Sequence, residues 1–218
     1  MKKKAPPKST AQPRIGRPRA IPSETDQPAA EEILAAARRL FREKGFKGTS
    51  TREIAEAAGL RQPSLFHYFK NKNEIFRAVV ARTVEPVIAF IQAESERDDP
   101  VDVALHRLIR HDTYHLCTNE NVLGSPFQFP ELTVASQPEF WRLREQIIDA
   151  YRQLLRRGEK QGVFEFDDLE IVTHFLFSLG ESTLTWYQKD RGRYDPDTVA
   201  DTAANLGLRG VLAEKRDV

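Results

Sequence analysis

The sequence has little cysteine and no long hydrophobic run. Cys117 is the only cysteine among 218 residues, which excludes an intrachain disulfide and is typical of a protein from the reducing cytoplasm. The longest apolar runs, such as residues 78–81, are too short to span a bilayer, and the basic N-terminus lacks the hydrophobic segment of a signal peptide. We therefore expect a cytoplasmic protein that does not enter the membrane.

Strand patterns and catalytic motifs are also missing. No segment alternates apolar and polar residues as a half-buried strand does. The sequence contains no glycine-rich phosphate loop, no nucleophile elbow and no paired cysteines. Neighbouring carboxylates, such as Asp167 with Asp168 and Asp195 with Asp197, stand where helices are expected to begin, so helix capping explains them. We expect an all-α protein that is not an enzyme and holds no metal or classical cofactor.

Charge is divided unevenly along the chain. The net charge is only +1, but residues 1–83 hold 18 Lys and Arg against 8 Asp and Glu, a balance of +10. Residues 84–218 hold 15 against 24, a balance of −9. A basic N-terminal part on an acidic remainder indicates a polyanionic partner for that part alone. Nucleic acid is the favoured partner, and an acidic membrane surface is the alternative.

Residues 1–27 are rich in Lys, Pro, Ser and Arg and have no apolar period, which predicts a disordered basic arm. Gly16-Arg17-Pro18-Arg19 resembles the core of an AT-hook, an extended element whose arginines enter narrow A·T minor grooves. Because the motif is so short, a solubilising tail with sequence-independent attraction to phosphates is the favoured alternative. Arg17 and Arg19 are candidate DNA contacts on the first interpretation.

The most informative stretch is residues 50–69. Its apolar spacing predicts a short helix over 50–58, which a Ser50–Glu53 capping box begins and Gly59 ends. A second short helix is expected to begin near Gln62 and to turn Leu65 and Phe69 inward. It leaves polar and aromatic groups on its outer side, namely Gln62, Ser64, His67 and Tyr68. Two short helices joined by a glycine turn are typical of a helix-turn-helix.

The rest of the chain is also predicted to be helical. A helix over 28–44 precedes the helix-turn-helix, and another begins at Asn71 and continues past Pro86 with a kink. Four further helices are expected over residues 101–117, 139–157, 168–189 and 196–213. We therefore expect a DNA-binding head at 28–73 and a helical body at 74–218.

These residues resemble the TetR family of transcriptional regulators. The resemblance covers about 50 residues and rests on Ile33–Ala37, Leu40-Phe41, Gly45-Phe46, Thr49-Ser50-Thr51, Ile54-Ala55, Ala58-Gly59, Ser64-Leu65-Phe66-His67-Tyr68-Phe69, Lys72 and Ile75. It implies a three-helix DNA-binding head, a helical body that binds a small molecule, and a homodimer formed through residues 168–189 and 196–213.

The resemblance also implies roles for single residues. Thr51 would hold a phosphate, His67 and Tyr68 would meet the DNA backbone or a base edge, and Lys70 and Lys72 would meet phosphates. Arg61, Gln62 and Ser64 would lie at the turn and the first turn of the recognition helix. Arg and Gln can make bidentate contacts to base edges, although an exposed Gln is often only solvated, and a phosphate is favoured for Arg61. The lysines alone would equally fit a solvated helix start.

Three residues depart from the family pattern. Arg61 stands where a small capping residue is usual, so the recognition helix is expected to lack a side-chain cap. Pro63 replaces a common glycine and limits how closely the backbone can approach DNA. Phe66 replaces the usual tyrosine and its hydroxyl. We expect these changes to retune DNA binding rather than abolish it, because phosphate neutralisation supplies much of the affinity.

The expected dimer and ligand site are less directly marked. Small residues in the last two helices would allow close helix approach between subunits, or would serve packing within one subunit. Polar and aromatic side chains could line a cavity in the body, namely His111, Tyr114, His115, Phe127, Trp141, Phe177 and Trp186. The aromatic ones could equally be core. His111 and His115 share a helix face and could bind a metal, but Cys117 could join them only if the helix had ended.

The sequence thus predicts a dimeric repressor that binds a palindromic operator in double-stranded DNA and is released by a small-molecule effector. Two rival hypotheses stay open. One is a helical carrier or enzyme with a vestigial head, and the other is an architectural DNA binder that uses its arm.

Overall fold

The protein is all-helical over the part described by the computed structural model, which comprises residues 29–120, 122–123, 133–187 and 193–213. The predicted all-α fold is therefore confirmed there, with one isolated bridge between Phe164 and Leu212. The eight helices of the described residues are α1 (Ala29–Lys44), α2 (Thr51–Ala57), α3 (Gln62–Leu65), α4 (Lys72–Ser95), α5 (Val101–Thr118), α6 (Pro138–Lys160), α7 (Leu169–Trp186) and α8 (Pro196–Arg209). The predicted arm lies outside the described residues.

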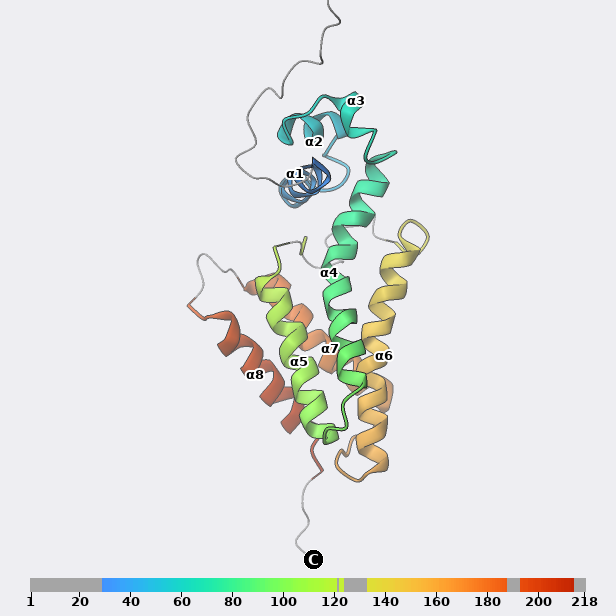
Figure 1. Cartoon of the computed structure of the whole chain (residues 1–218). Helices are drawn as coiled ribbons and strands as arrows, with labels where there is room; N and C mark the ends of the chain where they lie inside the picture. Colours follow the sequence, from blue (N-terminus) through green and yellow to red (C-terminus); the bar gives the residue numbers. More distant parts are fainter. Residues whose placement is uncertain (1–28, 121, 124–132, 188–192, 214–218) are drawn as a thin grey trace, which may run out of the picture.

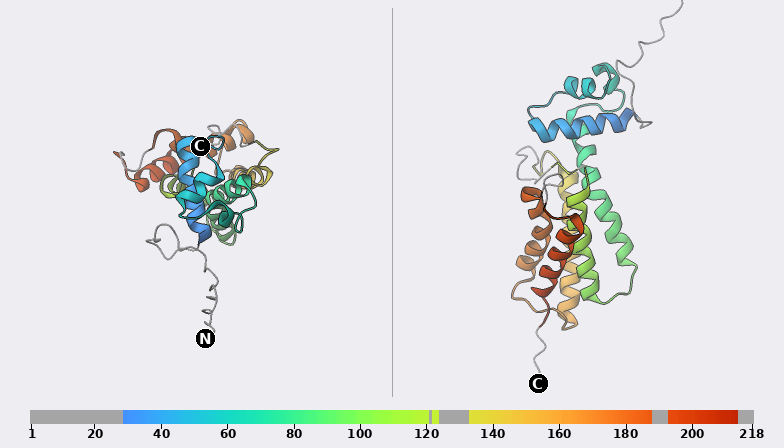
Figure 2. Two further views of the ribbon diagram at one scale, coloured as in Figure 1. Left: turned by 90° about the horizontal axis from the view of Figure 1, so that it is seen from above. Right: turned by 90° about the vertical axis from the view of Figure 1, so that its left-hand side faces the viewer.

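The helices form a small head and a longer body joined by α4 (Figure 1). In the head, α1, α2, α3 and the first turns of α4 enclose one core, in which Phe41 and Phe76 meet edge to face with ring centroids 5.3 Å apart. In the body, α5 packs against α4, α6, α7 and α8 around a second core (Figure 2). Helix α4 gives Val79 and Val80 to the first core and Val84 and Val87 to the second. A movement of α4 therefore changes the packing of both parts.

Pro86 lies inside α4 and does not end it. Proline has no N–H, so it cannot bond the carbonyl oxygen of Arg82 four residues earlier. The side-chain amide of Asn119, the C-cap residue of α5, donates to that oxygen over 3.2 Å. The unpaired acceptor created by Pro86 is thus satisfied from another helix.

Two helices of the body end at other residues than their apolar patterns do. The sequence allows the helix over 139–157 to stop at Gly158 or at Gly162, and α6 runs to Lys160, with Gly158 buried inside it and leaving room for the Phe164 ring. The turn comes at Gly162, whose positive φ of 68° glycine adopts without strain. Helix α8 ends at Arg209 because residues 211–213 pair with the turn after α6, through Glu165 N to Val211 O (2.9 Å) and Ala213 N to Val163 O (3.0 Å).

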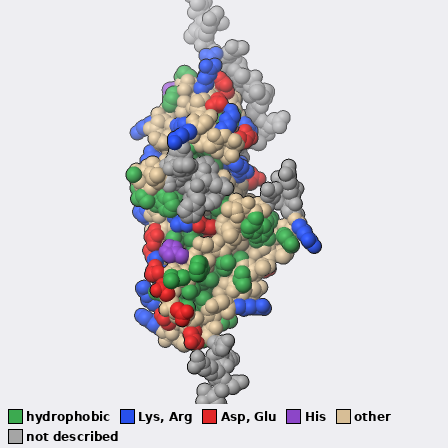
Figure 3. Space-filling view, turned by 180° about the vertical axis from the view of Figure 1, so that it is seen from behind, with side chains coloured by type: hydrophobic (Ala, Val, Ile, Leu, Met, Phe, Trp, Pro, Cys, Tyr) green, Lys and Arg blue, Asp and Glu red, His purple; other side chains and the backbone are tan. Residues whose placement is uncertain are grey.

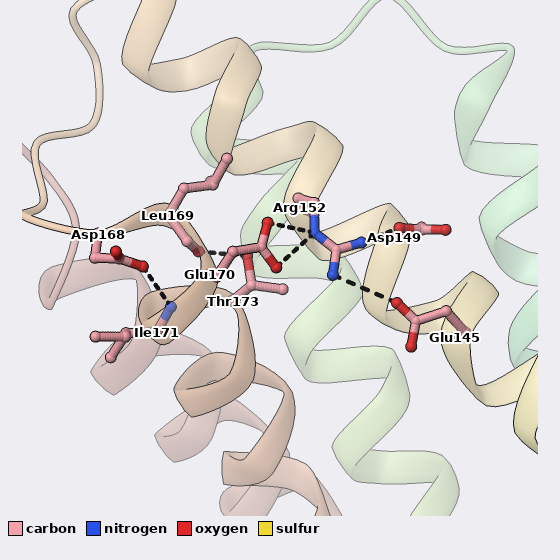
Figure 4. A network of polar contacts seen from close by, with 8 residues as sticks. All are labelled: Glu145, Asp149, Arg152, Asp168, Leu169, Glu170, Ile171 and Thr173. Atoms are coloured by element: carbon pink, nitrogen blue, oxygen red, sulfur yellow. Dashed lines mark hydrogen bonds and ion pairs between the residues drawn. The ribbon is translucent and has the colours of Figure 1, made fainter.

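Ion pairs fix α6 against α7 (Figure 4). Arg152 donates through Nε to both carboxylate oxygens of Glu170 (2.8 and 3.0 Å) and also pairs with Asp149 and Glu145. Asp168 caps α7 by accepting from the Ile171 N–H at 2.9 Å. This network fixes the start of α7 and with it the outer face of the body.

Candidate DNA-binding surface and body cavity

The first candidate site is the outer surface of α2 and α3. Ser50 and Glu53 form the predicted capping box at the start of α2, and Lys44 pairs with Glu53 over 2.7 Å. Lys44, together with Ser50, lowers the pKa of Glu53 to about 2. Gly59 has a φ of 68° and turns the chain toward α3. The start of α2, which carries Thr51, is therefore capped by a carboxylate that stays ionised at any physiological pH.

Helix α3 is short and turns a polar side outward. Leu65 is fully buried and Phe69 packs against the head core, as the spacing predicts. Arg61, His67, Tyr68 and Lys70 are exposed, while Gln62 and Ser64 are half-buried. The helix has no side-chain cap at Arg61, as predicted. Pro63 lies in the first turn, which needs no N–H from it.

Two predicted DNA-binding side chains contact each other. Gln62 Nε2 donates to Thr51 Oγ1 over 2.9 Å, so the amide is oriented by α2. The bond joins the beginnings of α2 and α3 across the glycine turn. A base contact from Gln62 would have to replace this bond or use the remaining groups of the amide.

Lys72 has a structural role that the sequence did not indicate. Its Nζ donates to the carbonyl oxygens of Phe46 and Thr49, each over 2.8 Å, and lies 4.3 Å from the centroid of the Phe46 ring. The ammonium group therefore holds the loop before α2 against the start of α4. An ammonium has three donors, so one remains for a phosphate after these two bonds.

The second candidate site is a cavity in the body, lined in part by the middle of α4. Its volume is about 70 Å³, so a drug-sized molecule would enter only if the walls moved apart. Apolar groups make up most of the lining, namely Phe76, Val80, Val84, Val87, Leu116, Val122, Leu123, Phe140, Ile147, Phe177 and Leu184. Its polar groups are Thr83, Asp112, His115, Arg144 and Glu181.

Of the side chains expected around a cavity, His115 and Phe177 line this one. His111 does not, because its ring stacks on Phe90 with centroids 3.7 Å apart. Tyr114 lies at the surface beside Arg110, and Trp186 is 51% exposed on the outside of α7. The Trp141 ring lies against the Arg144 guanidinium instead of lining the cavity. Phe127 lies outside the described residues.

Three polar residues of the cavity were missed by the sequence reasoning. Asp112 is almost fully buried and accepts a hydrogen bond from the Tyr151 hydroxyl over 3.1 Å. Arg144 and Glu181 form a paired contact from α6 to α7. Asp112 could have been found, because it follows Leu105, Leu108 and Ile109 at helical spacing and so interrupts the apolar stripe of α5 with a carboxylate.

The end of α5 connects this cavity to the head. His115, which lines the cavity, donates from Nε2 to the Thr83 carbonyl oxygen over 2.7 Å. Thr83 follows Arg82, whose carbonyl oxygen accepts from Asn119. Beyond α5, the carbonyl oxygens of Glu120 and Val122 accept from the Arg42 guanidinium of α1 over 3.1 and 2.9 Å. Val122 is itself part of the cavity wall. Residues at and just beyond the end of α5, namely His115, Asn119 and Val122, therefore contact the cavity, α4 and the head.

Metal binding and membrane insertion find no support in the described residues. Cys117 lies inside α5, so it cannot turn toward His111 and His115. The described part of the chain contains no group of three His, Cys, Asp or Glu side chains arranged to hold a metal ion. None of its helices is both long and apolar enough to cross a bilayer.

Family models match both parts of the chain. The model described as bacterial regulatory proteins of the tetR family matches residues 33–79, and the tetracyclin repressor-like C-terminal domain matches residues 99–211. The chain belongs to the TetR family. Its members are transcriptional regulators, so the resemblance expected from the helix-turn-helix is confirmed.

Known TetR-family proteins resemble the chain over most of its length. The transcriptional repressor KstR2 of Rhodococcus jostii is 26% identical over 201 residues, covering 84% of this chain and 90% of KstR2. The crystal structure of Mycobacterium smegmatis AmtR is 31% identical, covers 90% of each chain and superimposes with a TM-score of 0.72. AibR, solved in complex with isovaleryl coenzyme A and operator DNA, shares the fold with 20% identity and a TM-score of 0.70, covering 82% of this chain and 97% of AibR.

Proposed function

We propose that this TetR-family regulator is a dimeric repressor, which binds a palindromic operator through α2 and α3 and is released by a small molecule bound in the body cavity. The observation that carries the proposal is the set of contacts made by His115, Asn119 and Val122. His115 and Val122 line the cavity, His115 and Asn119 bond to α4 near Pro86, and Val122 bonds to α1 of the head.

DNA contact through the head is supported by its exposed polar side and its charge. Arg61, His67, Tyr68 and Lys70 are exposed around the short recognition helix. Gln62 and Ser64 at its start are the proposed base readers, and Thr51 and Lys72 are proposed phosphate contacts. Arg17 and Arg19 of the arm would add minor-groove or phosphate contacts. Related AibR was solved with operator DNA, which agrees with this use of the fold.

A dimer is supported by an exposed apolar face on α7 and α8. Ile171, Phe175 and Trp186 of α7 and Leu206 of α8 are between 51% and 69% exposed. Ile171 and Phe175 are four residues apart, so they share a face of α7, and hydrophobic side chains gather on the body when it is seen from behind (Figure 3). Exposed apolar area of this kind marks an interaction surface, and two-fold homodimers are the commonest soluble oligomers.

The small residues of α7 and α8 are weaker support for the dimer. A Cβ at Gly207 would lie 2.8 Å from Ile109, and one at Gly180 would lie 3.3 Å from Thr113, both in α5. These glycines therefore serve close packing within the subunit. The exposed apolar side chains, rather than the glycines, mark the proposed interface.

Release by an effector follows from the size and position of the cavity. A bound molecule larger than the present 70 Å³ must push its walls apart, and those walls include His115, Val122 and Val84. Displacing these walls strains the hydrogen bond from His115 to Thr83 and the one from Arg42 to Val122. The head would then change its angle relative to the body. Release requires that the effector bind the altered conformation more tightly than the DNA-binding one.

Selection of bound sequences from a random DNA pool tests the proposal. The expected result is a palindrome with half-sites about one helical turn apart, roughly 34 Å, because each head reads one major groove. Gln62→Ala should then change the preference at one base pair of each half-site. A pool that yields no enriched sequence, or a single half-site without symmetry, would contradict the proposal.

A further inference from the structure

Two carboxyl groups and one guanidinium of the body cavity come from three helices. Asp112 comes from α5, Arg144 from α6 and Glu181 from α7. They lie near one another, since a Cβ on Gly180, the residue before Glu181, would be 3.7 Å from Asp112 Oδ2. The cavity therefore combines a largely apolar wall with a compact group of charged side chains.

The positive charge in this group already has its partner. Arg144 donates from Nε and Nη2 to the two carboxylate oxygens of Glu181, over 3.2 and 2.6 Å. Its guanidinium also lies 4.6 Å from the centroid of the Phe177 ring. A two-bond pair between guanidinium and carboxylate is among the strongest side-chain contacts, so a ligand would have to break it to use Arg144.

The Asp112 carboxyl has no cation of its own in the cavity. It is 3% exposed, and within the described part of the chain it accepts a hydrogen bond from the neutral Tyr151 hydroxyl. With two carboxylates and one guanidinium, the polar group has a surplus of negative charge whenever Asp112 is ionised. A ligand carboxylate or phosphate would add a further negative charge to a buried site, which is strongly unfavourable.

We propose that the cavity takes an apolar small molecule bearing a protonated amine, whose ammonium group pairs with the Asp112 carboxylate. This inference rests on the proposed role of the cavity as the effector site. The hydrocarbon part of the ligand would lie against the apolar wall toward α4, and Tyr151 would keep the carboxylate in position through its hydroxyl.

The protonation of Asp112 makes the proposal measurable. Burial raises the pKa of Asp112 to about 7, the Tyr151 hydrogen bond lowers it, and the charges of Glu181 and Arg144 oppose each other. His115, on the same helix, has its pKa lowered by burial, while its hydrogen bond to the Thr83 carbonyl oxygen raises that pKa. A bound ammonium favours the ionised carboxyl, so binding releases a proton at pH 6 and affinity rises from pH 6 to pH 8.

Three probes with one hydrocarbon body test the charge preference. Cyclohexylmethylamine, cyclohexylmethanol and cyclohexanecarboxylate are titrated into the full-length protein by calorimetry at pH 6 and pH 8, in buffers of different ionisation enthalpy. At pH 8 the amine should bind at least about tenfold more tightly than the alcohol, since hydrogen bonds to a charged group are the stronger ones. At pH 6 its apparent binding enthalpy should depend on the buffer, because a proton is released.

Asp112→Asn should remove both the tenfold preference and the dependence on buffer. Asp98→Asn, which removes the same charge at an exposed position, should leave both unchanged. Tighter binding of the carboxylate, equal binding of all three probes, or no binding of any at millimolar concentration would overturn the proposal. Operator binding measured on the same preparation separates such a failure from a failure of the proposed repressor function.

Discussion

The side-chain amide of Asn119 at the end of α5 bonds the carbonyl oxygen of Arg82, the acceptor that Pro86 leaves unpaired in α4. Arg82 also forms an ion pair with Glu31 of α1, which lowers the pKa of Glu31. Arg82 thus joins α4 to the head and to the end of the cavity-lining helix α5.

This relationship predicts that positions 86 and 119 are energetically coupled. Asn119→Ala should lower the free energy of unfolding by about 1–2 kcal/mol, because it leaves the Arg82 oxygen without a donor. In a Pro86→Ala background, the restored N–H can bond that oxygen within α4, so the same substitution should cost about 1 kcal/mol less. Urea denaturation of the four proteins measures the coupling.

Thr118→Ala is the control for this cycle, since Thr118 bonds only back along α5, to the Tyr114 carbonyl oxygen, among the contacts described. It should cost the same in both backgrounds. Strict additivity of Asn119→Ala and Pro86→Ala would mean that Asn119 does not satisfy the acceptor exposed by the proline.

The sequence predicted the local structure of the head better than its long-range contacts. Ser50, Glu53 and Gly59 act on residues within a few positions, so their signals for helix start and stop are readable in the chain. The bonds of Lys72 reach carbonyl groups 23 and 26 residues away, and no local pattern encodes those.

Lys70 and Lys72 should therefore behave differently when replaced by alanine. Lys72→Ala loses two carbonyl contacts and should destabilise the protein by about 1–3 kcal/mol as well as weaken DNA binding. Lys70 is exposed, so Lys70→Ala should leave thermal stability nearly unchanged while flattening the salt dependence of DNA binding by about one unit. Thermal unfolding and salt-dependent anisotropy separate the two effects; equal loss of stability in both variants would contradict the structural role of Lys72.

Helical spacing also showed which faces were apolar, but not what each face meets. The apolar pattern predicts that Trp186 lines the cavity with the other aromatic residues, yet its side chain is exposed on the outer side of α7. A face that packs inside the subunit and one that packs against a second copy have the same period. Only the three-dimensional arrangement distinguishes them.

The exposed face of α7 predicts a dimer that one charge can disrupt. Phe175 is 69% exposed, and Phe175→Asp should place a carboxylate in the proposed interface, giving a folded monomer at micromolar concentration and at least about tenfold weaker operator binding. Light scattering after gel filtration measures the mass. Val134, 65% exposed and outside α7 and α8, offers a matched control, since Val134→Asp should stay dimeric. A dimeric Phe175→Asp protein would place the interface elsewhere.

Burial of Asp112 predicts a particular pH dependence of stability. Its pKa in the folded protein, about 7, exceeds the ordinary value of 3.8, so the native state binds more protons than the unfolded state between these values. Stability contributed by the protonated carboxyl is therefore lost as pH rises toward 7. Asp112→Asn cannot ionise and should gain stability over wild type as pH rises from 5 to 8. Melting temperatures at both pH values test this, and a difference that does not grow with pH would contradict it.

In the proposed function, the two heads of one dimer read a single palindromic site. It is tested most directly by fluorescence anisotropy with the selected palindrome and with the same half-sites moved apart by half a helical turn, about 5 base pairs. We expect this insertion to lower the affinity by at least about a hundredfold, toward that of nonspecific DNA, because the two heads can no longer face their major grooves at the same time. Unchanged affinity for the spaced site would contradict it.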